Sequence, residues 1–295
     1  VASNMCHKFP KALVGAIKRY KYGQVDIKLG LIMGIFAELG VQVGIMIQKA
    51  ILDKWGQAGS NLYVSLIFVL VLVVVGSFVM RDAVKMKRAK IEVDTAVSAL
   101  AQRLQKIELW PMMTMKTANV RISMWFLIPV ALATGMLAAT IAVGGFIGVP
   151  GMMYIIGVTS IVASATELVI AFVMGLGGTL IWAYYGMVDI RLVMIILAGS
   201  LFGVQLGAIG TTYVKDYMIK YVMATIMLIV AVSRLFALPK YLTELHLLSM
   251  NATGVAIMTK LSFGIMCLAL LIGASIILAN LFKARRLEKA AMLGV

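Results

Sequence analysis

Long runs without a single charged side chain constrain the fold of this chain more than any other feature. Residues 122–166 form an uncharged run of 45 residues, and shorter uncharged runs cover 62–80, 168–188, 192–214 and 261–282. A helix of about 20 apolar residues crosses the hydrocarbon core of a bilayer, so the longest run has room for two crossings. Hydrocarbon offers no hydrogen-bond partner to a free backbone group, so every crossing must be helical. The runs predict an all-α integral membrane protein, a polytopic helical bundle.

The composition excludes most other classes of protein. Hydrophobic residues make up 62% of the chain and charged residues 13%, whereas a soluble domain has about 25% charged residues. The net charge of +15 fits Lys and Arg gathered on the cytoplasmic side of a membrane better than a nucleic-acid interface. Cys6 and Cys267 lie far apart, and the sequence shows no metal-ligand spacing, nucleotide loop or catalytic triad. We therefore expect no enzyme, no cofactor, no metal and no nucleic-acid partner.

The distribution of Lys and Arg predicts the orientation in the membrane. One set of loops holds 19 basic residues, in 18–28, 81–121, 211–221 and the tail after Phe282. The opposing loops hold 5, in 52–61, 184–191 and 234–260. By the positive-inside rule, the connector 81–121 and the C-terminus should be cytoplasmic, in a protein of the cell inner (plasma) membrane.

The same pattern divides the chain into four parts. Two weaker candidate spans, 27–49 with Glu38 inside it and 216–236, join the uncharged runs. We expect a first transmembrane repeat over 1–80, a connector over 81–121, a second transmembrane repeat over 122–236, and a final span with a basic tail over 237–295. Within the connector, helical spacing predicts a short amphipathic helix through Val97, Leu100, Leu104 and Ile107.

The chain contains an internal repeat. Residues 22–44 and 185–207 align without a gap at an offset of 163, and 11 of the 23 positions are identical. The loop of the first copy carries four basic residues, whereas that of the second carries only Arg191. Equivalent loops of opposite basicity predict inverted repeats, the architecture of many secondary transporters, with the substrate site between the copies.

The first copy is shorter than the second. Residue 1 corresponds to residue 164, so nothing in the first copy matches 124–163. We expect the first repeat to be incomplete in this sequence, which then begins downstream of the natural N-terminus.

The repeated loops and a glycine-rich segment resemble a known family. The segment resembles the glycine-rich motif of the TauE/SafE sulfite exporter family (TSUP, DUF81) at Gly144, Gly145, Phe146, Val149 and Pro150. Ser164-Ala165-Thr166 stands where the family has a small-residue segment, and Gly23 to Asp26 and Gly186 to Asp189 are similar to its G-x-V-D signature. Val143 replaces one glycine of the motif, and the first copy lacks the motif. The resemblance implies transport of a small anion: sulfite, a sulfonate, or a related sulfur oxyanion or carboxylate.

The glycine-rich segment also predicts a broken helix. Gly144 to Pro150 should interrupt the helix, and Pro150 suits the first turn of a new one that runs to Ala163. A broken helix presents free N–H groups and a positive dipole end to an anion. The alternative is that these glycines only allow close helix packing.

Polar residues at the starts of helices are candidate ligands. Ser164 and Thr166, and Ser3 and Asn4 at the equivalent start of the first copy, should begin the next helix in each copy. Their oxygens and amides suit either helix capping or an oxyanion.

Charged residues at membrane depth are candidates for binding and coupling. Lys8 could neutralise a bound anion, and His7 could take part in proton coupling. The alternative is that Lys8 lies at the interface and snorkels. Glu38 and Glu167 are candidate proton carriers, although Glu167 also suits the first turn of a helix.

The remaining repeated residues predict structural roles. Asp26 and Asp189 take N-cap positions. Gly40-x-x-x-Gly44 and Gly203-x-x-x-Gly207 predict packing faces, and Gln42 and Gln205 fit interhelical hydrogen bonds better than ligand contacts.

Together these features predict a multi-pass permease for a small anion, with the lipid bilayer as its setting and alternating access between the repeats as its mechanism. Two alternatives stay open. A membrane-embedded thiol-redox or assembly protein would need Cys6 and Cys267 to meet, and a passive anion channel would share the same sequence features.

Overall fold

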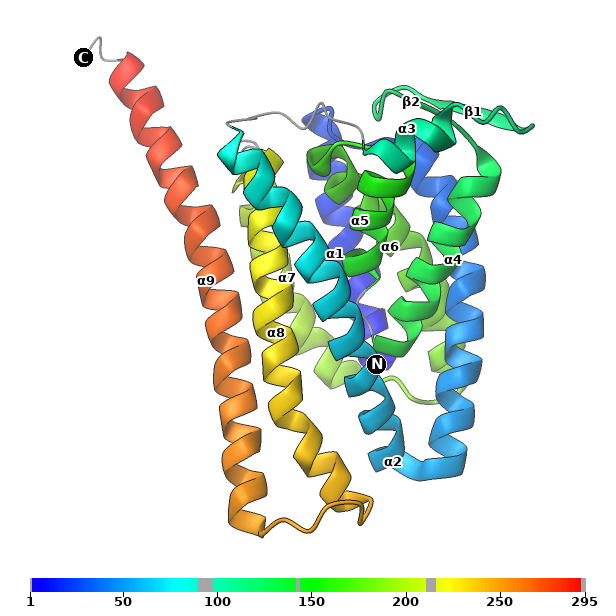
Figure 1. Cartoon of the computed structure of the whole chain (residues 1–295), viewed down its shortest axis with the longest axis vertical. Helices are drawn as coiled ribbons and strands as arrows, with labels where there is room; N and C mark the ends of the chain where they lie inside the picture. Colours follow the sequence, from blue (N-terminus) through cyan, green and yellow to red (C-terminus); the bar gives the residue numbers. More distant parts are fainter. Residues whose placement is uncertain (1, 90–97, 142–143, 211–215, 293–295) are drawn as a thin grey trace. The chain divides into compact units, whose positions relative to one another are not determined.

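The computed structural model describes residues 2–89, 98–141, 144–210 and 216–292 (Figure 1). Its elements follow the chain as α1 (Ala2–Lys21), α2 (Ile27–Arg88), α3 (Ala99–Gln105), β1 (Met112–Met115), β2 (Val120–Ser123), α4 (Met124–Ile141), α5 (Gly145–Gly151), the π-helix η1 (Met152–Ile156), α6 (Ser160–Tyr184), α7 (Ile190–Gly210), α8 (Asp216–Glu244) and α9 (Ala252–Met292).

The predicted all-α membrane architecture is confirmed. Within the described ranges, six helices are long and apolar enough to cross a bilayer: α2, α4, α6, α7, α8 and α9. The antiparallel hairpin of β1 and β2, which begins in the connector and ends at Ser123, was not predicted. Helix α1 is not among the six, because Lys and His side chains lower its hydropathy.

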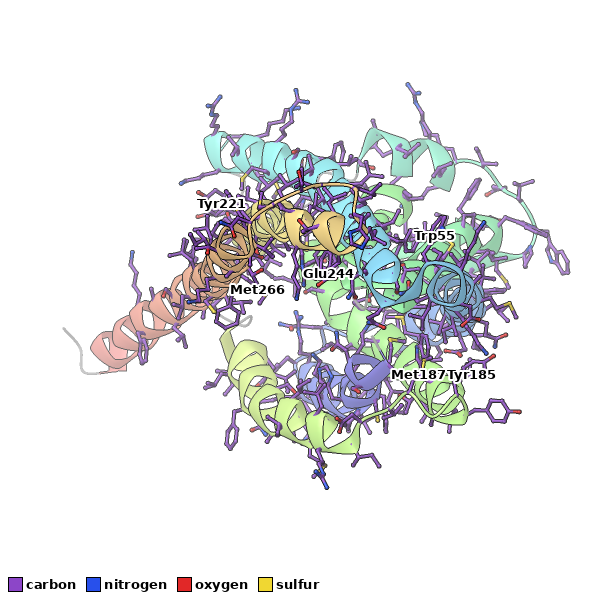
Figure 2. All side chains as sticks on the ribbon, turned by 90° about the horizontal axis from the view of Figure 1, so that it is seen from below. Trp55, Tyr185, Met187, Tyr221, Glu244 and Met266 are labelled. Carbon is purple, nitrogen blue, oxygen red and sulfur yellow. The ribbon has the colours of Figure 1, made fainter. Side chains whose placement is uncertain are left out.

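The turn expected over 52–61 is present, but it is shorter than a loop. Two helical parts of α2 meet across a kink at Gly56, which has φ 64° and ψ −168°. Glycine adopts a positive φ without steric cost, so one residue turns the chain where a loop was expected. Trp55, labelled in Figure 2, precedes this bend and is exposed.

The chain forms two compact units. The first unit contains residues 1–60 and 94–205, and the second contains residues 61–93 and 206–295. In the second unit α8 lies along α9, and Lys220, only 2% exposed, donates to Asp82 Oδ2 over 2.7 Å. In the first unit α1 lies along α6.

The contacts between α1 and α6 repeat at equivalent positions of the two copies. A Cβ atom at Gly15 would lie 2.8 Å from Val204 and 3.1 Å from Leu168. At Gly178, the equivalent residue, it would lie 2.7 Å from Met5 and 3.2 Å from Val41. Met5 and Val41 are the equivalents of Leu168 and Val204 at the same offset. The two central helices therefore use the same positions to contact each other.

The two small-residue faces differ. Helix α4 closes over the first face: a Cβ atom at Gly40 would overlap the Leu132 carbonyl, and one at Gly44 would lie 2.5 Å from the Met136 carbonyl. Gly203 and Gly207 face open space in the described part of the chain. The packing role predicted for this second pair is therefore not present in this structure.

The two repeated glutamines also lie outside helix contacts. The side chains of Gln42 and Gln205 are exposed. The backbone carbonyl of Gln205 accepts a hydrogen bond from Lys18 Nζ over 3.3 Å.

Helix α3 of the connector packs within the first unit. Ser98 caps α3 and donates to the Tyr154 carbonyl, and Gln105 Nε2 donates to the Ile156 carbonyl over 2.8 Å. Helix α3 therefore binds the carbonyl end of η1. Val97, part of the predicted amphipathic helix, lies outside the described residues, and Leu100 points outward, 52% exposed.

Candidate functional site

The break in the glycine-rich segment lies elsewhere than predicted. Helix α4 ends at Ile141, while α5 and η1 form one short apolar helix over Gly145–Ile156. Pro150 is inside α5 and does not start a new helix, which corrects the sequence-based expectation. Because proline lacks the N–H group, it removes one helical hydrogen bond, and the helix widens into the π-turns of η1 directly afterwards. Val143 lies outside the described residues.

The second interruption follows η1. Gly157, with φ 92°, ends the π-helix, and α6 begins at Ser160 after Thr159 at the N-cap position. Ser164 and Thr166 therefore lie inside α6 and do not start it, contrary to expectation. Helix α6 begins about one turn earlier than expected, because Thr159 has the extended backbone of an N-cap residue.

Most of the small polar side chains that were predicted to bind the anion are already hydrogen-bonded to other groups of the protein. Thr166 Oγ1 accepts from the Asp26 N–H over 3.1 Å, and Ser3 Oγ, at the equivalent position, accepts from the Asp189 N–H over 3.0 Å. Ser164 Oγ accepts from Arg19 over 2.9 Å. Asn4 is exposed. Ser3, near the start of α1, thus binds the backbone that follows α6. Thr166, in the first turns of α6, binds the backbone that follows α1.

Asp26 and Asp189 both take the N-cap position. Asp26 Oδ1 accepts from the Leu29 N–H over 3.0 Å, and Asp189 Oδ1 accepts from the Leu192 N–H over 3.2 Å. Asp26 is buried at 3% exposure, and its second oxygen accepts from the N–H groups of Thr117 and Ala118, each over 3.0 Å. The cap of α2 thus also holds the turn of the hairpin.

Five ionisable side chains of the described structure have a buried polar atom without a hydrogen-bond partner: His7, Lys8, Glu38, Glu167 and Arg234. Three of them are His7, 3% exposed, through Nδ1; Lys8 through Nζ; and Glu167, 7% exposed, through both carboxylate oxygens. Lys8 and Glu167 interact electrostatically. Nearly all buried polar atoms in proteins are hydrogen-bonded, so such a group of free donors and acceptors points to a ligand site. We call His7, Lys8 and Glu167 the buried polar cluster.

Two glycines of α5 make room for the Glu167 carboxylate. A Cβ atom at Gly145 would lie 3.5 Å from Glu167 Cγ and 3.6 Å from Oε1, which is ordinary contact. A Cβ atom at Gly148 would overlap Oε2 and would lie 3.0 Å from Thr134 Cγ2. Gly144, at the N-cap position, and Phe146, half-buried, continue the same segment. The start of α5 therefore lies against a carboxylate.

Glu38 lies beside the other end of the cluster. Its carboxylate lies against Gly177 of α6, where a Cβ atom would overlap it, and Oε2 is buried without a partner among the described residues. Gly177 follows Glu167 by ten residues, about 15 Å along a helix. Phe9 and Met5 contact Gly175 and Gly178. Glu38 is therefore at the level of His7 and Lys8, and Glu167 is further along α6.

A family comparison covers all of these residues. A family model described as Sulfite exporter TauE/SafE matches residues 1–234. The chain belongs to the TauE/SafE sulfite exporter family. Comparisons with curated proteins and with solved structures returned no match.

Membership of the TauE/SafE family makes the chain a multi-pass membrane transporter and not an enzyme, and it implies an anionic substrate. The matched range contains the buried polar cluster, the glycines of α5 and both N-cap aspartates. It ends inside α8, so α9 lies outside it. The described residues contain no group of three metal-ligating side chains, and Cys6 and Cys267 are both free thiols.

Sequence reasoning missed two arginines of this TauE/SafE protein. Arg19, 5% exposed, donates to Gln24 Oε1 over 2.8 Å and to the Ile161 carbonyl over 3.0 Å. Arg234 was assigned to an outer loop, but α8 continues to Glu244, and the guanidinium lies 5.1 Å from the Phe68 ring centre. Arg234 is half-buried, and its charge at the end of an apolar run was the available signal.

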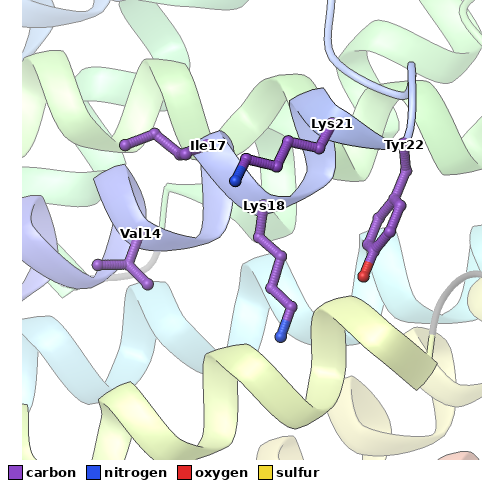
Figure 3. A pocket seen from close by; sticks show the side chains of 5 residues that line it. All are labelled: Val14, Ile17, Lys18, Lys21 and Tyr22. Carbon is purple, nitrogen blue, oxygen red and sulfur yellow. The ribbon is translucent and has the colours of Figure 1, made fainter.

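A separate hollow of about 380 Å³ lies along the second half of α1. Val14, Ile17, Lys18, Lys21 and Tyr22 line it (Figure 3). It is open and basic, unlike the buried polar cluster, and no predicted site residue lines it. His246 is exposed in the turn after α8. Tyr185, labelled in Figure 2, carries Lys49 Nζ 3.9 Å from its ring centre.

The two glycines of α5 give a matched pair for mutation. We expect Gly148→Ala to lower the initial rate of anion transport about tenfold, because overpacking of this kind costs about 1–3 kcal/mol and displaces the Glu167 carboxylate. Gly145→Ala should keep most of the rate, since its Cβ atom has ordinary contacts. Initial rates in proteoliposomes measure both, and equal rates in the two variants would contradict the assigned role of Gly148.

Proposed function

We propose that this TauE/SafE protein is a permease that moves a small sulfur-containing anion, such as sulfite or a sulfonate, by alternating access. The observation that carries the proposal is the Lys8 ammonium, which is buried in α1 without a hydrogen-bond partner in the described structure. A lysine at membrane depth costs at least about 2.5–3.5 kcal/mol. An anion that enters the site would offset this cost and supply the missing acceptor.

The oxygens of a sulfite or sulfonate group suit the donors of the buried polar cluster. Lys8 Nζ has three N–H donors, and neutral His7 adds one more in the tautomer that carries its hydrogen on Nδ1. Gly144 and Gly145 stand at the start of a short helix, whose first N–H groups have no partner within the helix. We place the anion between Lys8 and this helix start.

The exchanged hydrogen bonds support the inverted repeats that this mechanism requires. Ser3, near the start of α1, binds the Asp189 N–H after α6, and Thr166, in α6, binds the Asp26 N–H after α1. Each central helix thus starts near the end of the other, as expected for two copies of opposite direction. The copies are not identical in charge, because Lys8 corresponds to Ala171 and Glu167 to Asn4. We therefore propose one charged site at the interface between the copies, not two.

We propose that the protein lies in a cell inner (plasma) membrane with the connector and the C-terminus in the cytoplasm. The excess of Lys and Arg in the connector and tail supports this orientation.

Uptake into proteoliposomes tests the function. The full chain is reconstituted, a proton gradient is imposed, and the uptake of labelled sulfite and methanesulfonate is followed. We expect saturable uptake that accumulates the anion above its external concentration. Equilibration without accumulation would identify a passive channel, and no flux of either anion would reject the permease. Uptake unaffected by reductant would rule out the thiol relay.

A further inference from the structure

We propose that Glu167 is a tethered occupant of the anion site: its carboxylate fills the concavity of α5 and excludes the substrate anion, and protonation of Glu167 admits the anion together with one proton. This inference rests on the proposed function and names the coupling device of the same site.

The first step of the argument is the position of the carboxylate. Glu167 is 7% exposed, both of its oxygens lack a hydrogen-bond partner in the described residues, and they lie against Gly145 and Gly148. A carboxylate kept only for stability would be hydrogen-bonded or ion-paired. Here it faces the start of the helix Gly145–Ile156, where the helix dipole favours negative charge. Glu167 thus stands where a bound anion would gain the same stabilisation.

The second step is the charge balance. Of the elements that contact Glu167, α4, α5 and η1 contain no Asp, Glu, His, Lys or Arg. Gly30 of α2 contacts the neighbouring Thr166 and Val169 and brings no charge. Helix α1 carries His7, Lys8 and Lys11. Lys8 interacts with Glu167, whereas the charges of Lys8 and Lys11 act on each other and on His7. One cation therefore faces Glu167, and it can balance one negative charge.

The third step follows from electrostatic repulsion. Two negative charges about 4 Å apart repel by about 4 kcal/mol in a partly screened protein environment. If Lys8 faced both an ionised Glu167 and a substrate anion, one negative charge would remain uncompensated. Lys8 with a neutral Glu167 and one anion is balanced, and the protonated carboxyl can donate a hydrogen bond to the anion. The anion and the ionised carboxylate therefore exclude each other.

The transport cycle is balanced in charge and protons. On one side of the membrane Glu167 takes a proton from water, moves off α5, and the anion binds there and to Lys8. On the other side Glu167 Oε returns the proton to water, and its carboxylate displaces the anion. One proton therefore accompanies each monovalent anion.

Glu167→Gln in the full chain tests the proposal, with methanesulfonate as the probe because its charge is constant with pH. In wild type, net uptake should rise by up to about tenfold per unit decrease in pH. In Glu167→Gln, uptake should be independent of pH and should not accumulate under a proton gradient, while exchange of internal for external methanesulfonate should persist. Glu38→Gln, a matched neutralisation in the neighbouring helix, should keep the wild-type pH dependence.

Several outcomes would overturn the proposal. Gradient-driven accumulation in Glu167→Gln, or its loss in Glu38→Gln alone, would assign coupling elsewhere. Loss of exchange in folded Glu167→Gln would show that the side chain binds the anion and does not compete with it. If Glu167→Gln does not fold, Glu167→Asp decides. Its shorter side chain fills the concavity less, so uptake at alkaline pH should exceed that of wild type, and unchanged uptake would reject the idea. Failure of wild type to move methanesulfonate or sulfite would instead reject the proposed function.

Discussion

Replacing Lys8 with Met is expected to lower the initial rate of sulfite and methanesulfonate uptake by about 100-fold. The substitution keeps a long flexible side chain in α1 but removes the positive charge from the buried polar cluster. Charge neutralisation at this depth changes the energy of the site by about 2.5–3.5 kcal/mol, which corresponds to about two orders of magnitude. Uptake should fall through weaker binding, so the rate at saturating anion should fall less than the rate at low anion.

The controls for Lys8→Met separate a local effect from a general loss of positive charge. Lys54→Met removes an exposed lysine from α2 and should leave uptake unchanged. Lys8→Arg keeps the charge with a bulkier, planar head group and should recover part of the rate. Normal uptake by Lys8→Met would remove this lysine from the site and would leave the permease without the cation on which its assignment depends.

Replacing Asp26 with Ala is expected to destabilise the protein far more than the same change at Asp189. Asp26 is buried and accepts hydrogen bonds from Leu29, Thr117 and Ala118. Each buried donor left without a partner costs about 1–3 kcal/mol, so the total should be about 3 kcal/mol or more. Asp189 is exposed and caps only its own helix, so its loss should cost about 1 kcal/mol.

Thermal denaturation in detergent measures both aspartate variants. Limited proteolysis adds a second measurement, because Asp26→Ala should also release the hairpin and expose the turn at Thr117 to cleavage. Equal stabilities of the two variants would show that the hairpin contacts of Asp26 contribute nothing. Asp26→Asn keeps one oxygen acceptor and should fall between wild type and Asp26→Ala.

The sequence patterns predicted what depends on local or one-dimensional properties of the chain. The uncharged runs predicted most of the spanning helices, since the cost of burying charge in hydrocarbon acts on every residue of a span. The second crossing expected within 122–166 is instead the short helix Gly145–Ile156. The G-x-V-D loops predicted two N-caps because capping needs only neighbouring residues. Membership of the TauE/SafE family, shown over residues 1–234, agrees with the resemblance stated from the glycine-rich segment.

Features that depend on tertiary contacts were not predicted. The position of Pro150 inside α5 could not be read from the sequence, because a short helix between two breaks is set by its packing against α4 and α6 and not by its own residues. The same applies to Gly56, where one left-handed residue replaced an expected loop. The contact of Glu167 with Gly148 joins residues on different helices, and only the fold brings them together. Arg19 is buried, but it lies in a run of basic residues, so nothing in the local sequence distinguishes it from the lysines around it.

The exchanged bonds between Ser3 and Asp189 and between Thr166 and Asp26 have a consequence for biosynthesis. The chain is made from its N-terminal side, so α1 leaves the ribosome well before α6 and Asp189 exist. During that interval the His7 and Lys8 side chains have no α6 beside them, and α1, the least apolar of the central helices, has little reason to enter lipid alone. Membrane insertion of α1 should therefore be completed late, when α6 and the residues after it arrive.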